Sequence, residues 1–148
     1  MITGREDVIA LEVHDPHMVG QLGYARRLLT ALEDAGISYI SKCTNANTIT
    51  HIVTGGNGSI ETCAQRIRQI FPEAVVRILP VALISVLGTR LPFPKVVADA
   101  TLALLRAKVD ILALSQATRR VSLQVVIERG QSNIAQVALH RVLVEEAD

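Results

Sequence analysis

The sequence predicts an α+β fold built from two copies of one β-α-β-β-α-β unit. Short apolar runs of the kind found in strands alternate with longer runs of helical period. The same order of patterns then returns, since 73 residues separate Val8 from Val81 and 72 separate Ile37 from Val109. A nearly constant offset indicates an internal duplication. Each copy is expected to form a ferredoxin-like unit with an antiparallel sheet and both helices on one face.

The first copy opens with a predicted strand and an amphipathic helix. Residues 8–13 ("VIALEV") place Ile9, Leu11 and Val13 on one face, as in a half-buried strand. A helical stripe follows and is expected to end at Gly36, because glycine commonly stops helices. The residues of this predicted stripe are Leu22, Ala25, Leu29 and Leu32.

A hairpin, a second helix and a closing strand complete the first copy. The β-branched runs 37–44 and 47–53 predict the hairpin. The glycine-rich segment 54–59 ("TGGNGS") leads to the second helix, which Pro72 closes, and residues 74–79 form the last strand. The apolar stripe of the second helix holds Ile60, Cys63, Ala64, Ile67, Ile70 and Phe71.

The second copy repeats this order but lacks a final strand. Its predicted strands are residues 81–87, 109–115 and 121–127, and its helices cover residues 94–107 and a segment that starts at Ser132. The apolar face of the last helix holds Ile134, Val137, Ala138, Val142 and Leu143. The predicted domains are residues 1–79 and 80–148. Either another segment supplies the closing strand of the second domain, or the chain is part of a longer protein.

Composition narrows the function classes. Of the 148 residues, 49% are hydrophobic and 3% are aromatic, and the net charge is only +1. Nucleic-acid binding is not expected, because the chain shows neither a basic stripe nor stacking aromatics. Its apolar runs are too short to span a bilayer. Cys43 and Cys63 lack the spacing of metal-binding cysteines, and we interpret them as reduced thiols. These features predict a cytoplasmic protein that self-associates.

Few residues suggest catalysis or a cofactor. His14 and His17 lie three apart without further ligands, so we interpret them as loop histidines and expect no metal. The 54–59 segment lacks the lysine of a phosphate-binding loop, so it is interpreted as a connector capped by Ser59. No nucleophile, base and orienting acid can be assembled, and no cofactor is expected. A small standalone ferredoxin-like enzyme is kept as one alternative.

The order of motifs resembles the regulatory region of aspartokinases, which consists of two ACT domains. The resemblance covers essentially the whole chain and is carried by "ITGREDVIALEV" and "HMVGQLGYARRLLTALEDAGISYI" in the first half, and by "VALISVLG", "ALLRAKVDILALSQ", "VSLQVVIE" and "ALHRVL" in the second. The resemblance implies amino-acid sensing and feedback control in lysine biosynthesis and the related aspartate-family pathways. It further implies three kinds of partner: an aspartokinase catalytic domain, an effector such as lysine, threonine or methionine, and a second copy joined through ACT sheets or helices.

The resemblance also implies an effector site between the turn after the first strand and the facing second and third strands. A glycine turn at a helix start suits a carboxylate, because free N–H groups and the partial positive charge of the helix end face it. Lysine-sensing members commonly have Asp at the position of Ile40 and Ser-Glu at Asn45-Ala46. The implied site residues are Met18, Gly20, Gln21, Gly23, Tyr24 and Ala25 in the turn, with Tyr39, Ile40, Thr44, Asn45, Ala46 and Asn47 opposite.

In the second copy, residues 116–120 ("QATRR") stand where the family usually has "QGSSE". Two arginines therefore replace the acidic end of this hairpin, which can alter an interface or a ligand. A purely structural dimerisation module with a decayed effector site is the first alternative to amino-acid sensing, ahead of the standalone enzyme.

Overall fold

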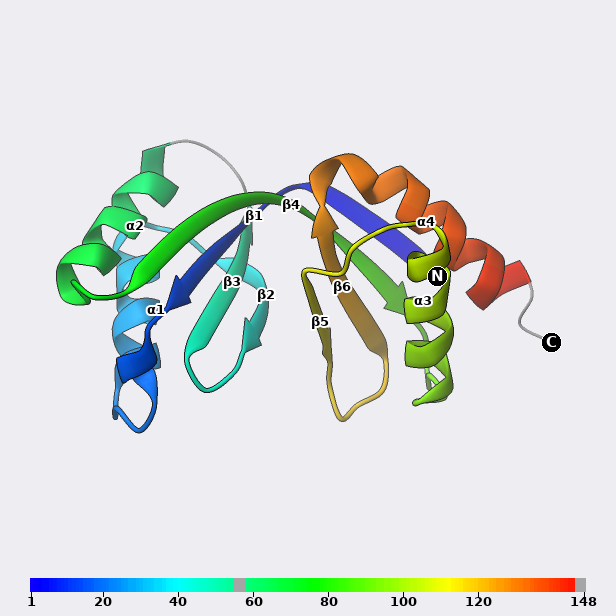
Figure 1. Ribbon diagram of the computed structural model, residues 1–148, viewed down its shortest axis with the longest axis horizontal. Coiled ribbons are helices and arrows are strands. Elements are labelled where there is room, and N and C mark those ends of the chain that lie inside the picture. The colour runs from blue at the N-terminus through cyan, green and yellow to red at the C-terminus, as the bar shows by residue number, and fades with distance from the viewer. Residues whose placement is uncertain (55–57, 146–148) are drawn as a thin grey trace. The chain divides into compact units, whose positions relative to one another are not determined.

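The computed structural model describes residues 1–54 and 58–145, and these form two compact units. One unit is Asp7–Pro80, and the other combines Met1–Glu6 with Val81–Asp148. Two long strands, β1 (Ile2–His14) and β4 (Val75–Leu87), contribute residues to both units. The predicted α+β fold of duplicated β-α-β-β-α-β units is confirmed (Figure 1).

The Asp7–Pro80 unit contains a sheet with the strand order β2-β3-β1-β4, and its two helices lie on one face of this sheet (Figure 1). Antiparallel pairing of β3 with β1 sets Leu11 opposite His51 and His14 opposite Thr48. The predicted connector 54–59 lies partly outside the described residues, and α2 begins at Gly58. The elements between β1 and β4 are η1 (Pro16–Met18), α1 (Tyr24–Asp34), β2 (Tyr39–Thr44), β3 (Thr48–Thr54) and α2 (Gly58–Ile70).

Helix α1 packs with a face that differs in part from the predicted one. Gly23, with φ +77°, precedes the first helical residue, so Leu22 lies outside the helix and is 95% exposed. The predicted stripe is confirmed at Leu32, which is buried, and at Ala25, which packs against the core, but it is wrong at the exposed Leu22 and Leu29. The predicted stripe of α2 is buried except for the half-buried Ile70. The residues of α1 that enter the core are Tyr24, Leu28, Ala31 and Leu32.

The other unit takes its closing strand from the start of the chain. Its sheet has the order β1-β4-β6-β5, and Met1 and Leu87 exchange two backbone hydrogen bonds of 2.8 and 3.0 Å. Residues 1–6 therefore belong to this unit. The sequence analysis had instead assigned them to the first domain, residues 1–79. Its remaining elements are α3 (Lys95–Arg106), β5 (Ala113–Gln116), β6 (Ser122–Glu128), η2 (Arg129–Gln131), α4 (Ser132–His140) and the π-helix η3 (Arg141–Glu145).

Two further details differ from the sequence prediction. Pro80 does not separate two strands, because β4 runs through it from Val75 to Leu87. Helix α4 buries Ser132, Ala135 and Leu139, while the predicted core residues Ile134 and Val137 are more than half exposed. No helix in the part of the chain that the structure describes is long and apolar enough to cross a membrane.

A buried histidine lies within the Asp7–Pro80 unit. His51 on β3 is 2% exposed, its ring lies 5.1 Å from that of Tyr39, and its Nε2 has no hydrogen-bond partner among the described residues. Burial, helped by the nearby Lys42, lowers the pKa of His51 to about 4. The imidazole is therefore neutral in the folded protein at pH 7.

We predict that His51 makes this unit less stable as the pH falls. The unfolded chain takes up a proton near pH 6.5 and the folded chain near pH 4, so stability present above pH 6.5 is lost toward pH 4, by at most about 1.4 kcal/mol per pH unit. His51→Leu should flatten this dependence. Urea unfolding at pH 7.5, 5.5 and 4.5 can be followed by tyrosine fluorescence, since both tyrosines lie in this unit. Parallel profiles for the two proteins would contradict the prediction.

Candidate functional site

The turn between β1 and α1 is built from a short 3-10 helix and two glycines. Asp15 caps η1, with Pro16 as its first residue, and the backbone N–H of Met18 donates to the Asp15 carbonyl at 3.0 Å. Gly20 and Gly23 adopt φ angles of +76° and +77°, which favour glycine because a Cβ would be strained there. The turn therefore delivers the chain to the start of α1 without a capping side chain.

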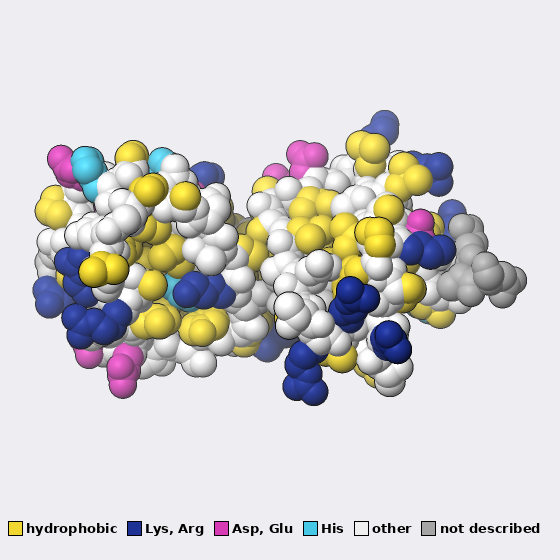
Figure 2. Space-filling view, turned by 90° about the horizontal axis from the view of Figure 1, so that it is seen from below, with side chains coloured by type: hydrophobic (Ala, Val, Ile, Leu, Met, Phe, Trp, Pro, Cys, Tyr) yellow, Lys and Arg dark blue, Asp and Glu magenta, His cyan; other side chains and the backbone are white. Residues whose placement is uncertain are grey.

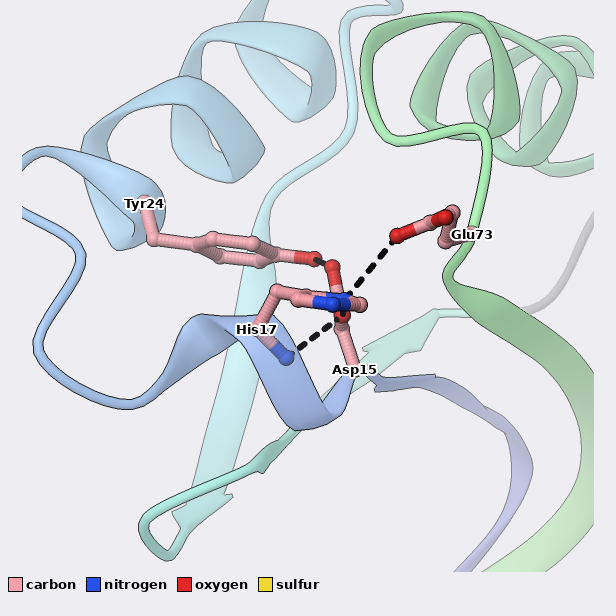
Figure 3. Close-up of polar contacts among 4 residues, drawn as sticks. All are labelled: Asp15, His17, Tyr24 and Glu73. Atoms are coloured by element: carbon pink, nitrogen blue, oxygen red, sulfur yellow. Dashed lines mark hydrogen bonds and ion pairs between the residues drawn. The ribbon is translucent and has the colours of Figure 1, made fainter.

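The buried carboxylate of Asp15 holds this turn together (Figure 3). The Tyr24 hydroxyl donates to Asp15 Oδ2 at 2.7 Å, and the backbone N–H of His17 donates to Asp15 Oδ1 at 2.9 Å. Asp15 is 4% exposed, and a charged group at such depth is tolerated only when it is hydrogen-bonded. One side chain thus connects η1 to the first residue of α1.

A partly exposed histidine extends the cluster toward the end of α2. His17 Nδ1 lies 3.2 Å from Asp15 Oδ1 and 3.0 Å from Glu73 Oε2 (Figure 3). Both His17 and Glu73 are largely exposed, so this part of the cluster contributes little to stability.

An aromatic pair packs beneath the turn. The rings of Tyr24 and Phe71 stack with centroids 3.8 Å apart and planes inclined by 15°. The Arg27 guanidinium lies 4.7 Å from the Phe71 centroid and also donates to the side-chain oxygen of Gln21 at 2.9 Å, once the Gln21 amide is oriented to satisfy both its groups. The predicted site residue Gln21 is therefore engaged within the turn itself.

The turn is attached to the β2–β3 hairpin by its backbone. The Asp15 N–H donates to the Asn47 carbonyl at 2.9 Å, and His14 Nδ1 lies 2.9 Å from the Thr48 hydroxyl. Within the hairpin, Asn45 Oδ1 accepts from the N–H groups of Asn47 and Thr48. These bonds join the beginning of the turn to Asn47 and Thr48 of the hairpin.

The structure does not bring every predicted site residue to this place. Tyr39 and Ile40 begin β2, and five residues of extended chain separate Tyr39 from Thr44, about 16 Å. Ile40 is the extra residue of a β-bulge, since Tyr39 and Ser41 pair with consecutive residues of β3. Among the predicted residues, Met18, Gly20, Gln21, Gly23, Tyr24 and Ala25 follow one another in the turn and first residues of α1, and Thr44, Asn45, Ala46 and Asn47 form the tip of the β2–β3 hairpin. The bond that joins the two segments is the one from the Asp15 N–H to the Asn47 carbonyl.

Figure 2 views the Asp7–Pro80 unit from the end that carries the turn and hairpin, and hydrophobic side chains are exposed there among Lys and Arg. The most exposed is Leu22, followed by Val19 at 62%. Met18 and Tyr24 are instead buried at 7% and 3% exposure. Those two predicted site residues shape the turn from below and leave the backbone of Gly20 and Gly23 at the surface.

Sequence reasoning missed Asp15, His17, Phe71 and Glu73. A signal for Asp15 was present, because Asp followed by Pro is typical of a helix cap and its first residue. The contacts of Phe71 and Glu73 depend on the end of α2, almost fifty residues after Tyr24, and no local pattern reports them.

The hydrogen bonds around Asp15 keep its buried carboxylate ionised. Burial by itself raises the pKa of the Asp15 carboxyl, but the hydrogen bonds from Tyr24 and His17 outweigh burial and hold the pKa below its usual 3.8. Burial and then the Asp15 carboxylate raise the pKa of the Tyr24 hydroxyl. Tyr24 therefore remains a donor and Asp15 an acceptor across the physiological range.

The chemical groups near the turn are limited. Among residues 1–54 and 58–145, no group of three or more His, Cys, Asp or Glu side chains can hold a metal ion. Burial raises the pKa of the Cys63 thiol, which makes this thiol a poor nucleophile. What the turn does offer is the N–H groups of Tyr24, Ala25 and Arg26, which have no acceptor within their own helix and can receive an anion.

Comparison with known proteins gives the chain its family. No family model matches. Aspartate kinase Ask_Ect from Stutzerimonas stutzeri (strain A1501) is 32% identical over 145 residues, which are 98% of this chain and 30% of that protein. The regulatory subunit of aspartate kinase from Thermus flavus superposes with a TM-score of 0.82 at 17% identity, and the match covers 95% of both chains. In sequence and in fold, the chain matches the regulatory region of aspartate kinases.

This aspartate kinase regulatory region spans about a third of the curated relative that it matches. Its ACT-type fold is shared with E. coli aspartokinase III, solved in complex with lysine and aspartate, at a TM-score of 0.75 and 16% identity. That match covers 97% of this chain and 32% of the E. coli chain. The structural match therefore involves essentially all of this chain.

We predict that Tyr24→Phe destabilises the Asp7–Pro80 unit by about 1 to 3 kcal/mol at pH 7, because the buried carboxylate loses its side-chain hydroxyl donor while the aromatic stack is kept. The pKa of Asp15 should rise, so its stabilising contribution is lost at higher pH than in the original protein. Urea unfolding and the Asp15 carboxyl resonance measure the two effects. Tyr39→Phe is the matched control, for which a change under 0.5 kcal/mol is expected. Equal effects of the two substitutions would contradict the role of Asp15.

Proposed function

We propose that this chain is the amino-acid-sensing ACT pair of an aspartate kinase and contributes to feedback control of aspartate-family amino-acid biosynthesis. One observation carries the proposal: the start of α1 has no side-chain cap, and the turn that precedes it is bonded through the Asp15 N–H to the Asn47 carbonyl of the β2–β3 hairpin. In this account the effector carboxylate binds the N–H groups of Tyr24 and Ala25, next to the glycines at positions 20 and 23.

The residues around the turn favour an effector with an uncharged side chain. Positions 39–47 contain no Asp or Glu, and Ile40 and Ala46 occupy the positions that are acidic in lysine-sensing relatives. Asp15 already accepts from Tyr24 and His17, and Glu73 pairs with His17. The side-chain ammonium of lysine would find no carboxylate here, and an unpaired ammonium is costly to bury. Threonine and methionine, whose side chains are uncharged, are therefore expected to bind more tightly than lysine.

Regulation requires a kinase domain and a second ACT unit. The matched part of Ask_Ect is less than a third of that protein, which leaves room for a catalytic domain as the partner on the same chain or on another. Tyr39 and Ile40 lie at the far end of β2, so they reach an effector at this turn only if another ACT unit presents them. Effector binding then shifts how ACT units associate, and this shift is the signal that the kinase domain receives.

We predict that threonine or methionine at millimolar concentration raises the melting temperature of the Asp7–Pro80 unit, by linkage between binding and folding. Tyrosine fluorescence reports this unit. Gly23→Ala should abolish the rise, because a Cβ enters the approach to the helix start while only Arg26 Nε, 4.0 Å away, lies near that carbon in the free protein.

Gly36→Ala is the matched control for Gly23→Ala. Gly36 also has a positive φ, of +68°, and open space around the added Cβ, but it follows the other end of α1. Both variants carry the same kind of backbone strain, so only the loss of ligand response separates them. No shift with lysine, threonine or methionine, or an equal response in Gly23→Ala, would refute sensing at this turn.

Self-association through helices is a second candidate function, favoured by the outer faces of α3 and α4. Leu105 is 72% exposed, and Ile134 and Val137 are 54% and 56% exposed. The outward positions of α1 and α2 instead carry mainly charged and polar residues such as Arg26 and Glu61. An exposed apolar surface of this kind is typical of interfaces, and we assign it to contact with a second copy.

We expect the chain to sediment as a dimer at micromolar concentration and the double variant L105R/I134R to sediment as a monomer. Both side chains are mainly exposed, so the substitutions should leave the circular dichroism spectrum unchanged. Arg66→Glu, on the exposed surface of α2, controls for a change of surface charge. A monomeric original protein, or a dimeric double variant, would exclude this interface.

A further inference from the structure

The unit formed by Met1–Glu6 and Val81–Asp148 contains a cavity of about 200 Å³. It lies between the end of β4, the start of α3 and the residues that follow α4, and all of its lining residues belong to this unit. Most of the lining is aliphatic and includes Val86, Leu91, Val96 and Leu143. Apolar cavities of this size hold small molecules, since one of about 150 Å³ can bind benzene.

Comparison of the two copies of the repeated unit explains the cavity. The buried residues of α1 and α3 match at an offset of 72, so that Tyr24 corresponds to Val96 and Leu28 to Ala100. The buried residues of α2 and α4 match at the same offset, which makes Leu143 the counterpart of Phe71. In the Asp7–Pro80 unit the stacked rings of Tyr24 and Phe71 fill this corner. Two smaller aliphatic side chains replace them here, and a cavity remains.

The rim of the cavity carries one positive and one negative side chain. Lys95 Nζ and Asp99 Oδ2 both belong to lining residues and lie 2.6 Å apart, one turn from each other on α3. Their side chains are 70% and 30% exposed, so this ion pair is weak and can exchange for contacts with a ligand at little cost. An aliphatic interior with adjacent ammonium and carboxylate groups at its mouth complements a zwitterion with an aliphatic side chain.

We propose that this cavity is a second ligand site, which binds a small aliphatic α-amino acid such as valine, leucine, isoleucine or methionine. The ligand side chain lies among Val86, Val96 and Leu143, its carboxylate pairs with Lys95, and its ammonium group pairs with Asp99. The site is independent of the β1–α1 turn and does not rest on the function proposed for it.

The test is an NMR titration of the full chain with each of the four amino acids, read from the methyl resonances of Val86 and Leu91, which line the cavity and are kept in every variant below. Saturable shifts at millimolar concentration are expected for at least one of them. Two fragments of leucine separate the roles of its groups: 4-methylpentanoate lacks the ammonium group and isopentylamine lacks the carboxylate. Each should bind at least about tenfold more weakly than leucine. Binding of both fragments as tightly as leucine would overturn the assignment to an amino acid.

Two variants complete the test. V96F/L143F restores aromatic bulk at the two positions and should abolish the shifts without lowering the melting temperature, whereas K95Q/D99N keeps the cavity and should weaken binding at least about tenfold. The second variant changes only rim residues, so it remains informative if the first does not fold. Absence of saturable shifts with all four amino acids, or unchanged affinity in K95Q/D99N, would overturn the proposal. Tyrosine fluorescence reports only the Asp7–Pro80 unit, so failure at one site is distinguishable from failure at the other.

Discussion

The hydrogen bond from the Tyr24 hydroxyl to the buried carboxylate of Asp15 is the interaction on which the candidate site depends. Asp15 uses its side chain to fix the turn to the start of α1, and it uses its backbone N–H to fix the same turn to the hairpin carbonyl of Asn47. An ionised group at 4% exposure has no inexpensive alternative arrangement. The glycines allow the turn to adopt several backbone conformations, and the hydrogen bonds of Asp15 stabilise one of them.

The same hydrogen bonds leave the backbone at the start of α1 as the open part of the turn. Tyr24 and His17 both donate to the Asp15 carboxylate, so this carboxylate is already occupied. The N–H groups at the start of α1 remain the available polar groups, and they suit a carboxylate. Because the Asp15 N–H donates to the Asn47 carbonyl, a displacement of the turn also acts on the hairpin.

The two copies of the unit have diverged at equivalent places. In the Asp7–Pro80 unit, the aromatic pair of Tyr24 and Phe71 fills the corner beneath the turn and supplies the donor for Asp15. In the other unit, Val96 and Leu143 leave the corresponding corner open. One duplicated framework therefore has a filled corner beneath the turn in one copy and an open corner in the other.

Much of this fold could be predicted from the sequence, because the hydrophobic period identifies strands and helices and the repeat identifies the duplication. Periodicity fails where the decisive contact is distant. The closing strand 2–6 pairs with β4, about eighty residues later in the chain, and the packed face of α1 depends on a left-handed Gly23 that moves Leu22 out of the helix. The turn itself was predictable from its glycines and the family resemblance. The Asp15 anchor was not, since its strength depends on burial.

The most direct test of the central claim is a map of backbone amide shifts by NMR while threonine or methionine is added to the full chain. The account predicts saturable shifts confined at first to Tyr24, Ala25 and the hairpin residues 45–47, with the N–H of His17 kept in its bond to Asp15. Absence of shifts in this group, or ligand-dependent shifts that fall elsewhere in the Asp7–Pro80 unit, would contradict it.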